Sequence, residues 1–171
     1  MITLVYGGSG SGKSAFAEDL VCKTNYQNRY YLATMKSFDE EADRRIEKHR
    51  KQREGKGFIT IEQPTDIANT IVDPDSIVLL ECMSNLVANE MFAGERNVSF
   101  TECADKIIDD VIALSRKATA LVIVSNNIFE GGVSYDEGTK EYMRALGLIN
   151  ERLAKLSNEV YEVVVGIGIK L

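Results

Sequence analysis

The sequence predicts an α/β fold, a three-layer sandwich in which a mainly parallel sheet carries helices on both faces. Apolar, β-rich runs recur along the chain, and helical patterns separate most of them. Strands that alternate with helices of about ten residues or more are typical of parallel sheets. The near-continuous apolar run at residues 77–80 fits a strand buried on both sides. Strands are expected at residues 2–6, 30–33, 58–61, 77–80, 121–124 and 160–169.

A glycine-rich loop begins directly after the first expected strand and matches the pattern G-x-x-x-x-G-K-[ST]. In this motif, successive backbone N–H groups surround one anion at the start of a helix. The alternative is an ordinary Gly/Ser turn, which is disfavoured because a strand precedes the loop and a helix follows it. The loop consists of Gly7, Gly8, Ser9, Gly10, Ser11, Gly12, Lys13 and Ser14.

This loop makes the expected sandwich P-loop NTPase-like and predicts binding of a nucleoside triphosphate or another polyphosphate. Lys13 would reach the β- and γ-phosphates and stabilise a transferring phosphoryl group, and the Ser14 hydroxyl would ligate Mg²⁺. The length of 171 residues suits one domain, a P-loop nucleotide-binding domain over residues 1–171.

Helices are expected where apolar residues recur at helical spacing. The helix after the loop has an apolar stripe, with Glu18 and Asp19 on its outer side. Two capping boxes, Ser37-x-x-Glu40 and Ser99-x-x-Glu102, predict the starts of later helices. The longer helices are expected at residues 38–53, 100–117 and 138–156.

The composition narrows the class of protein. A net charge of −6 argues against a nucleic-acid binder, which is usually basic or has a basic face. Neither a membrane span nor a leader is expected from the sequence, which predicts a cytoplasmic location. Cys22, Cys82 and Cys103 have no C-x-x-C spacing and are expected to be buried or half-buried free thiols.

Residues 126–137 form a loop after the fifth expected strand. Ligands of open α/β sheets lie beyond the carboxyl ends of strands, so this loop is expected to border the same crevice as the phosphate loop. The alternative is an ordinary surface connection.

A second group of polar residues lies on the helix expected at residues 38–53. Arg45, His49 and Arg53 are spaced four apart and therefore share one face. The flanking guanidiniums would disfavour an imidazolium and could hold phosphate oxygens, leaving a nitrogen lone pair for nucleophilic or general-base catalysis. The alternative, favoured by pattern alone, is a solvated charged face on which His49 is incidental.

Two carboxylates follow expected strands. Glu81 ends a buried strand, where P-loop enzymes place the acid that holds Mg²⁺. Its alternative role is to satisfy a helix N-terminus. Glu62 occupies a similar position and gives a weaker signal.

Over nearly its full length the chain resembles the bifunctional adenosylcobinamide kinase/adenosylcobinamide-phosphate guanylyltransferase family of cobalamin assembly. The phosphate loop is common among NTPases and is therefore less specific to this family than the helix around His49 and the ending at residues 166–170. The matching motifs are Tyr31-Leu32-Ala33-Thr34, Arg45-Ile46-x-x-His49-Arg50-x-x-Arg53, Leu79-Leu80-Glu81-Cys82, Gly147-x-x-Asn150-x-x-Leu153-Ala154, Asn158-Glu159-Val160-Tyr161 and Gly166-Ile167-Gly168-Ile169-Lys170.

The resemblance implies two reactions. ATP or GTP phosphorylates adenosylcobinamide, and GTP guanylylates a histidine that passes GMP to adenosylcobinamide phosphate. By position His49 is the nucleophile, which reverses the preference for an incidental histidine. The family also implies a homotrimer. Residues implied to contact the nucleotide or its metal, besides the loop, are Ala33, Thr34, Arg50, Lys51, Gln52, Arg53, Glu62 and Glu81.

The chain departs from the family pattern at Asn127, Phe129, Ser134 and Leu148, which bears on the kinase step and the corrinoid contacts more than on guanylylation. Two alternatives stay open at this point. One is a single-activity P-loop kinase for another small hydroxyl compound, with His49 only binding phosphate. The other is a nucleotide-dependent switch module.

Overall fold

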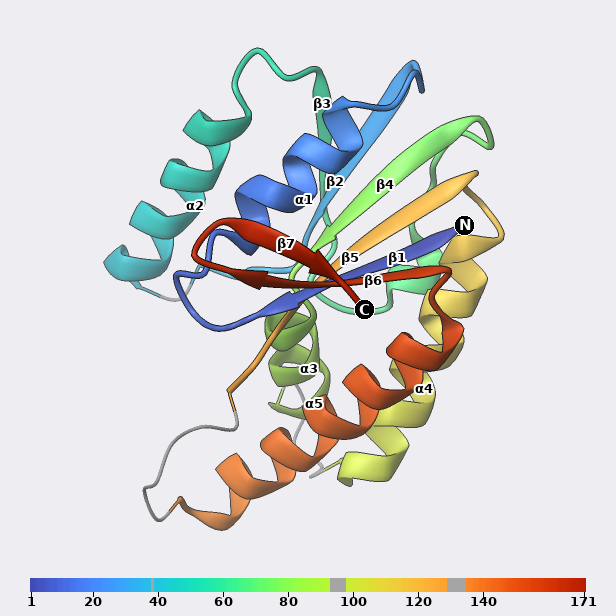
Figure 1. The fold of residues 1–171 in the computed structure, drawn as a ribbon. Helices are drawn as coiled ribbons and strands as arrows, with labels where there is room; N and C mark the ends of the chain where they lie inside the picture. The colour runs from blue at the N-terminus through green and yellow to red at the C-terminus, as the bar shows by residue number, and fades with distance from the viewer. Residues whose placement is uncertain (38, 93–97, 129–134) are drawn as a thin grey trace.

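The computed structural model describes residues 1–37, 39–92, 98–128 and 135–171, together with the backbone but not the side chain of Arg45. One seven-stranded sheet, in the order β3-β2-β4-β5-β1-β6-β7, forms the central layer of the described structure (Figure 1). All neighbouring strands are parallel except β6 and β7. The strands are β1 (Ile2–Gly7), β2 (Asn28–Ala33), β3 (Phe58–Glu62), β4 (Ser76–Glu81), β5 (Ala120–Asn126), β6 (Glu159–Val164) and β7 (Ile167–Lys170).

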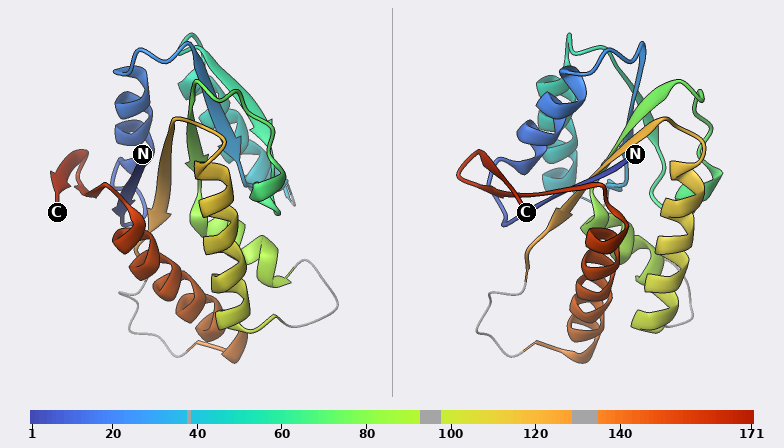
Figure 2. Two further views of the ribbon diagram at one scale, coloured as in Figure 1. Left: turned by 90° about the vertical axis from the view of Figure 1, so that its right-hand side faces the viewer. Right: turned by 45° about the vertical axis from the view of Figure 1, so that its right-hand side comes forward.

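Helices cover both faces of this sheet, which confirms the predicted three-layer sandwich (Figure 2). Alternate residues of the buried strand β4 supply the two cores: Val78 and Leu80 pack toward α3, α4 and α5, whereas Ile77 and Leu79 pack toward α1. Helix α2 lies on the α1 side. The helices are α1 (Lys13–Cys22), α2 (Glu40–Arg53), α3 (Met83–Phe92), α4 (Phe100–Ser115) and α5 (Glu137–Leu156), with the short 3₁₀ helix η1 (Ile67–Asn69) between β3 and β4.

Two expectations about helices are wrong. Glu18 of α1 does not face outward: its side chain is 1% exposed, and its Oε2 lies 2.6 Å from Nζ of Lys56. Helix α2 is not capped by Ser37, because the Asp39 side chain accepts the Ala42 N–H at 2.7 Å and caps the helix itself. The helix accordingly begins at Glu40, and Ser37 instead donates its hydroxyl to Asp43.

The capping box predicted at Ser99 is confirmed, with reciprocal contacts between Ser99 and Glu102 at the start of α4. The last expected strand is in fact a hairpin. Residues 160–169 do not form one strand because Val165 and Gly166 adopt left-handed conformations, with φ of 45° and 84°, and reverse the chain between β6 and β7.

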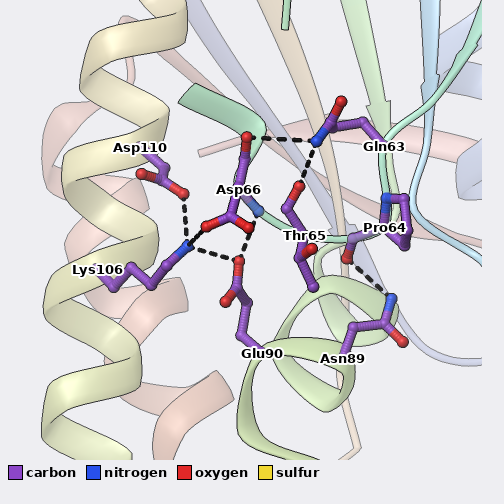
Figure 3. Close-up of polar contacts among 8 residues, drawn as sticks. All are labelled: Gln63, Pro64, Thr65, Asp66, Asn89, Glu90, Lys106 and Asp110. Atoms are coloured by element: carbon purple, nitrogen blue, oxygen red, sulfur yellow. Dashed lines mark hydrogen bonds and ion pairs between the residues drawn. The ribbon is translucent and has the colours of Figure 1, made fainter. Parts of the chain in front are cut away.

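Lys106 forms ion pairs with three carboxylates and so fixes the connection that follows β3 (Figure 3). Nζ of Lys106 on α4 lies 2.9 Å from Asp66, 2.7 Å from Glu90 and 3.0 Å from Asp110. Burial disfavours the charged form of Lys106, but these contacts together outweigh burial and raise its pKa, and the ammonium group lowers the pKa of Asp66. The lysine therefore joins η1, α3 and α4 electrostatically.

The three cysteines are free thiols, as predicted: Cys103 is buried, and Cys22 and Cys82 are half-buried. Within the described part of the chain, the helices are too short or too polar to cross a bilayer.

Candidate nucleotide-binding and transfer site

The glycine-rich loop joins the end of β1 to the start of α1. Gly10 and Gly12 have φ values of 71° and 87°, a region that side chains with a Cβ avoid. Gly12 is also the N-cap of α1 and has no side-chain cap. The unsatisfied N–H groups of the first helical turn are therefore available to an anion.

Lys13 begins α1 and is 8% exposed. Its Nζ donates to the Gly8 carbonyl oxygen at 3.0 Å, so the ammonium group lies inside the curve of the loop. Burial lowers the pKa of Lys13, while the neighbouring Cys82 and Glu81 oppose that shift. A phosphate group would compensate the charge that burial disfavours.

Strand register brings the predicted carboxylates to one edge of the sheet. Ala33 at the end of β2 is paired with Glu62 of β3 on one side and with Glu81 of β4 on the other. The hydroxyl of Ser14 donates to Oε1 of Glu81, and Oε2 of Glu81 is buried without a hydrogen-bond partner. The predicted pair of magnesium ligands, Ser14 and Glu81, is therefore in direct contact.

Helix α2 brings its C-terminal half to the same edge. Nδ1 of His49 lies 3.8 Å from Oε1 of Glu81, and Arg50 forms an ion pair of 2.6 Å with Glu62. The guanidinium of Arg53 lies over the Tyr31 ring, 3.4 Å from its centroid. Only part of the predicted arrangement of His49 between two guanidiniums lies within the described residues, because the Arg45 side chain is outside them. In the described part, a carboxylate lies beside the His49 ring, and Arg53 stacks on an aromatic side chain.

Arg53 has a buried nitrogen without a partner. Its side chain is 7% exposed, and Nη1 makes no hydrogen bond in the structure. Tyr31 stays neutral beneath it, because burial and the charge of Glu81 raise the pKa of the phenol. An unpaired buried guanidinium nitrogen favours an anionic ligand.

A cavity of about 670 Å³ joins these groups. Most predicted site residues line it, including His49 and much of the phosphate loop. The predicted residues that line it are Ser9, Gly10, Gly12, Lys13, Ser14, Ala33, His49, Arg50, Gln52, Arg53, Glu62 and Glu81.

Other predicted residues do not line this cavity. Thr34 is fully buried and holds Cys82, donating to its carbonyl oxygen and accepting its N–H, both at 2.8 Å. Lys51 also does not line the cavity, and its Nζ lies 3.4 Å from Glu47, one turn earlier on α2. Gly7, Gly8 and Ser11 belong to the loop but lie outside the cavity wall.

Sequence reasoning missed several lining residues. Tyr31 lies within a strand, and Ser84 and Asn85 lie in the first turn of α3, which directly follows the β4 tip. The positions of Ser84 and Asn85 in the sequence could have identified them, because polar residues just after a buried strand lie at the carboxyl edge of a parallel sheet. Cys82 also lines the cavity, and burial raises the pKa of its thiol.

The loop expected to border the crevice does so at its beginning. Asn126 lines the cavity, and the N–H of Asn127 donates to the Gly7 carbonyl oxygen at 2.9 Å. Phe129 and Ser134 lie outside the described residues. Leu148, on α5, packs against the larger core rather than near the cavity.

A strand that turns into a helix around a glycine-rich loop, with an acid at a nearby strand tip, is the geometry of P-loop nucleotide-binding proteins. The chain is of this class. Residues 3–171 match a family model described as cobinamide kinase / cobinamide phosphate guanyltransferase. The chain belongs to this family.

Full-length relatives agree with this assignment. The chain is 32% identical to the bifunctional adenosylcobalamin biosynthesis protein CobU of Escherichia coli K12, over 100% of this chain and 99% of the relative. It is 33% identical to the protein of the same name from Salmonella typhimurium LT2, with the same coverage. Among solved structures, flagellar accessory protein FlaH from Methanocaldococcus jannaschii aligns with a TM-score of 0.47 and 14% identity, over 94% of this chain and 70% of FlaH.

Proposed function

We propose that this protein phosphorylates adenosylcobinamide with ATP or GTP and then transfers GMP from GTP to adenosylcobinamide phosphate through a guanylyl-histidine at His49. Family membership assigns the chain to the cobinamide kinase and guanyltransferase class. The observation that carries the residue assignment is that one cavity is lined by the phosphate loop, Glu81 and His49.

In the kinase step, the oxygen of the substrate hydroxyl attacks the γ-phosphorus and gives up its proton. The bond from the γ-phosphorus to the β–γ bridging oxygen breaks, and a nucleoside diphosphate leaves. The loop N–H groups and Lys13 stabilise charge on the transferring phosphoryl group. The buried position of Lys13 strengthens this effect, because water screens its charge only weakly there.

In the guanylyl step, a ring nitrogen of His49 attacks the α-phosphorus of GTP, and pyrophosphate leaves. An oxygen of the cobinamide phosphate then displaces the histidine. Glu81 lies on the Nδ1 side of His49. Nδ1 makes no hydrogen bond at this distance, but the nearby negative charge favours the tautomer with its proton on Nδ1, which leaves Nε2 as the nucleophile.

The site fits Mg²⁺ by its donor chemistry. A serine hydroxyl and a carboxylate with one unpartnered oxygen are oxygen ligands of the kind that this ion prefers in nucleotide sites. When bound by Ser14 and Glu81, the ion would neutralise charge on the β- and γ-phosphates.

The test uses GTP labelled at the α-phosphate. We expect acid-labile, alkali-stable label on the wild-type protein and none on His49→Asn. Lys51→Ala is the matched control on the same helix, because Lys51 lies away from the cavity and should leave labelling unchanged. Label that survives His49→Asn would refute the covalent mechanism. A protein that phosphorylates adenosylcobinamide without any labelling would be a single-activity kinase.

We also propose a homotrimer, located in the cytoplasm and built from one nucleotide-binding domain per chain. The association of chains is supported by an apolar surface on the hairpin β6–β7, which is also an edge of the sheet. Light scattering after gel filtration should give three times the chain mass, and a monomer at micromolar concentration would contradict the trimer. The exposed apolar residues of this hairpin and the chain end are Val164, Val165, Ile167, Ile169 and Leu171.

A further inference from the structure

The C-terminal hairpin lies against the phosphate loop, although the two are at opposite ends of the sequence (Figure 1). Strand β6 pairs with β1, and β7 folds back on β6 through the turn at Val165 and Gly166. The motif Gly166-Ile167-Gly168 begins in this turn. This motif plays no part in the reactions described above.

The contacts between hairpin and loop are backbone contacts. The Gly166 N–H donates to the Ser11 carbonyl oxygen at 2.7 Å. A Cβ on Gly12 would lie 3.0 Å from the Gly166 Cα, and a Cβ on Gly7 would lie 2.6 Å from the Val163 carbonyl oxygen. The loop and the hairpin therefore approach as closely as glycine allows.

The hydrogen bond to Ser11 orients the next N–H of the loop. In a planar trans peptide the carbonyl and N–H point in opposite directions. When Gly166 holds the Ser11 carbonyl, the Gly12 N–H on the same peptide is directed away from the hairpin. Gly12 also lines the cavity. An N–H directed away from the hairpin at this position would face the place where a phosphate group would bind.

Gly168 fixes the distance between the hairpin and α1. A Cβ at this position would lie 2.1 Å from Cζ and 2.3 Å from Cε2 of Phe16, which follows Lys13 and Ser14 on α1. The Phe16 ring also packs against Tyr161 of β6, with centroids 5.4 Å apart. A side chain at residue 168 would therefore displace the hairpin from the loop or the ring from its place.

We propose that the C-terminal hairpin positions the phosphate loop: Gly166 orients the Ser11–Gly12 peptide toward the nucleotide phosphates, and Gly168 permits the close docking that this requires. Gly166 is thus a positioning residue. This inference rests on one part of the proposed function, namely that the phosphate loop binds a triphosphate.

The first test compares Gly166→Ala with Val165→Ala. Alanine at φ 84° is strained and should move the turn, whereas Val165 already has a Cβ and an exposed side chain. Calorimetry with the β,γ-imido analogue of GTP and with inorganic tripolyphosphate should show binding about tenfold weaker or more for Gly166→Ala. Val165→Ala should bind both probes within about twofold of wild type.

The second test uses Gly168→Ala with and without Phe16→Ala. Gly168→Ala should weaken tripolyphosphate binding in the wild-type background, and it should have little effect when Phe16→Ala has removed the ring. Melting temperature and oligomeric state are measured for every variant. A purely structural role would lower the melting temperature without changing the affinity of the folded protein.

The outcomes separate the two proposals. If the wild-type protein binds neither probe, the phosphate-loop function fails. If it binds both while Gly166→Ala and Gly168→Ala bind equally well, only the positioning role is refuted. An equal loss from Gly168→Ala in both Phe16 backgrounds would also refute the docking explanation. Should Gly166→Ala not fold, the Phe16 and Gly168 cycle decides alone.

Discussion

Replacing Lys56 by Met should destabilise the protein, because the substitution would leave the buried carboxylate of Glu18 without its cation. Glu18 is 1% exposed, its Oε2 is paired with Lys56 at 2.6 Å, and its Oε1 is buried without a partner. Removing one partner of a buried ion pair costs about 3–5 kcal/mol, because the other charge is left uncompensated. Since about a third of the Lys56 side chain is exposed, we expect a loss of about 2–3 kcal/mol in the free energy of unfolding.

The assay is urea denaturation of four proteins: wild type, Lys56→Met, Glu18→Leu, and the double variant. The double variant should regain most of the stability that Lys56→Met loses, since it no longer buries a charge. Lys51→Met is the matched control, an exposed ion pair whose removal should change stability by less than about 0.5 kcal/mol.

The pair with Glu18 raises the pKa of Lys56. The stabilisation is therefore present below the ordinary lysine pKa and is lost as pH rises through the raised value. A double variant no more stable than Lys56→Met would show that Glu18 is not the source of the loss.

Three further predictions concern other parts of the molecule. Lys13→Ala should lower turnover by about 10²–10³-fold, measured as phosphorylation of adenosylcobinamide, and unaffected turnover would refute the phosphate-loop assignment. Lys106→Met should lower the free energy of unfolding by about 1–3 kcal/mol at neutral pH, because three carboxylates lose their shared cation. That loss should shrink in acid as the carboxylates become protonated, and a pH-independent loss in urea titrations would contradict it. Burial raises the pKa of Cys103 to about 11, so this thiol should lower wild-type stability by about 2 kcal/mol between pH 9 and 11, because the unfolded thiol ionises first. Cys103→Ala should make this alkaline decline shallower in denaturant titrations without abolishing it, because Tyr31 and Cys82 also have raised pKa values. An unchanged decline in Cys103→Ala would contradict the prediction.

Local patterns predicted the sheet and the phosphate loop well. The apolar run at residues 77–80 lies inside β4, and the glycine pattern lies where β1 turns into α1. These features are encoded by neighbouring residues, so no distant partner is needed to read them. The capping box at Ser99 succeeded for the same reason.

Predictions failed where a distant or a competing residue decides the structure. Glu18 looks like an outward-facing residue of an amphipathic helix until Lys56 is placed beside it. Ser37 satisfies the capping pattern, but Asp39 lies closer to the helix and caps it with its own carboxylate. The apolar character of residues 160–169 concealed the turn at Val165 and Gly166.

The candidate site shows both cases. Sequence spacing correctly placed His49 and Arg53 one helical turn apart, and the structure puts both on the cavity wall. Their contacts are with residues of the sheet: His49 lies beside Glu81 of β4, and Arg53 lies over Tyr31 of β2. Helical spacing alone cannot reveal such neighbours, because strand register in the folded sheet brings them together.

The lysine among three carboxylates supplies a counterion that is part of the polypeptide itself. Unlike a bound metal, it cannot be removed by a chelator or exchanged for another ion, so this junction of η1, α3 and α4 does not depend on which metal ions the medium contains. Oxygens of Asp66, Glu90 and Asp110 all lie within 4.8 Å of one another. Shortening the lysine, as in Lys106→Ala, would leave a ready set of hard ligands. A luminescent lanthanide bound by these carboxylates would then report on this junction.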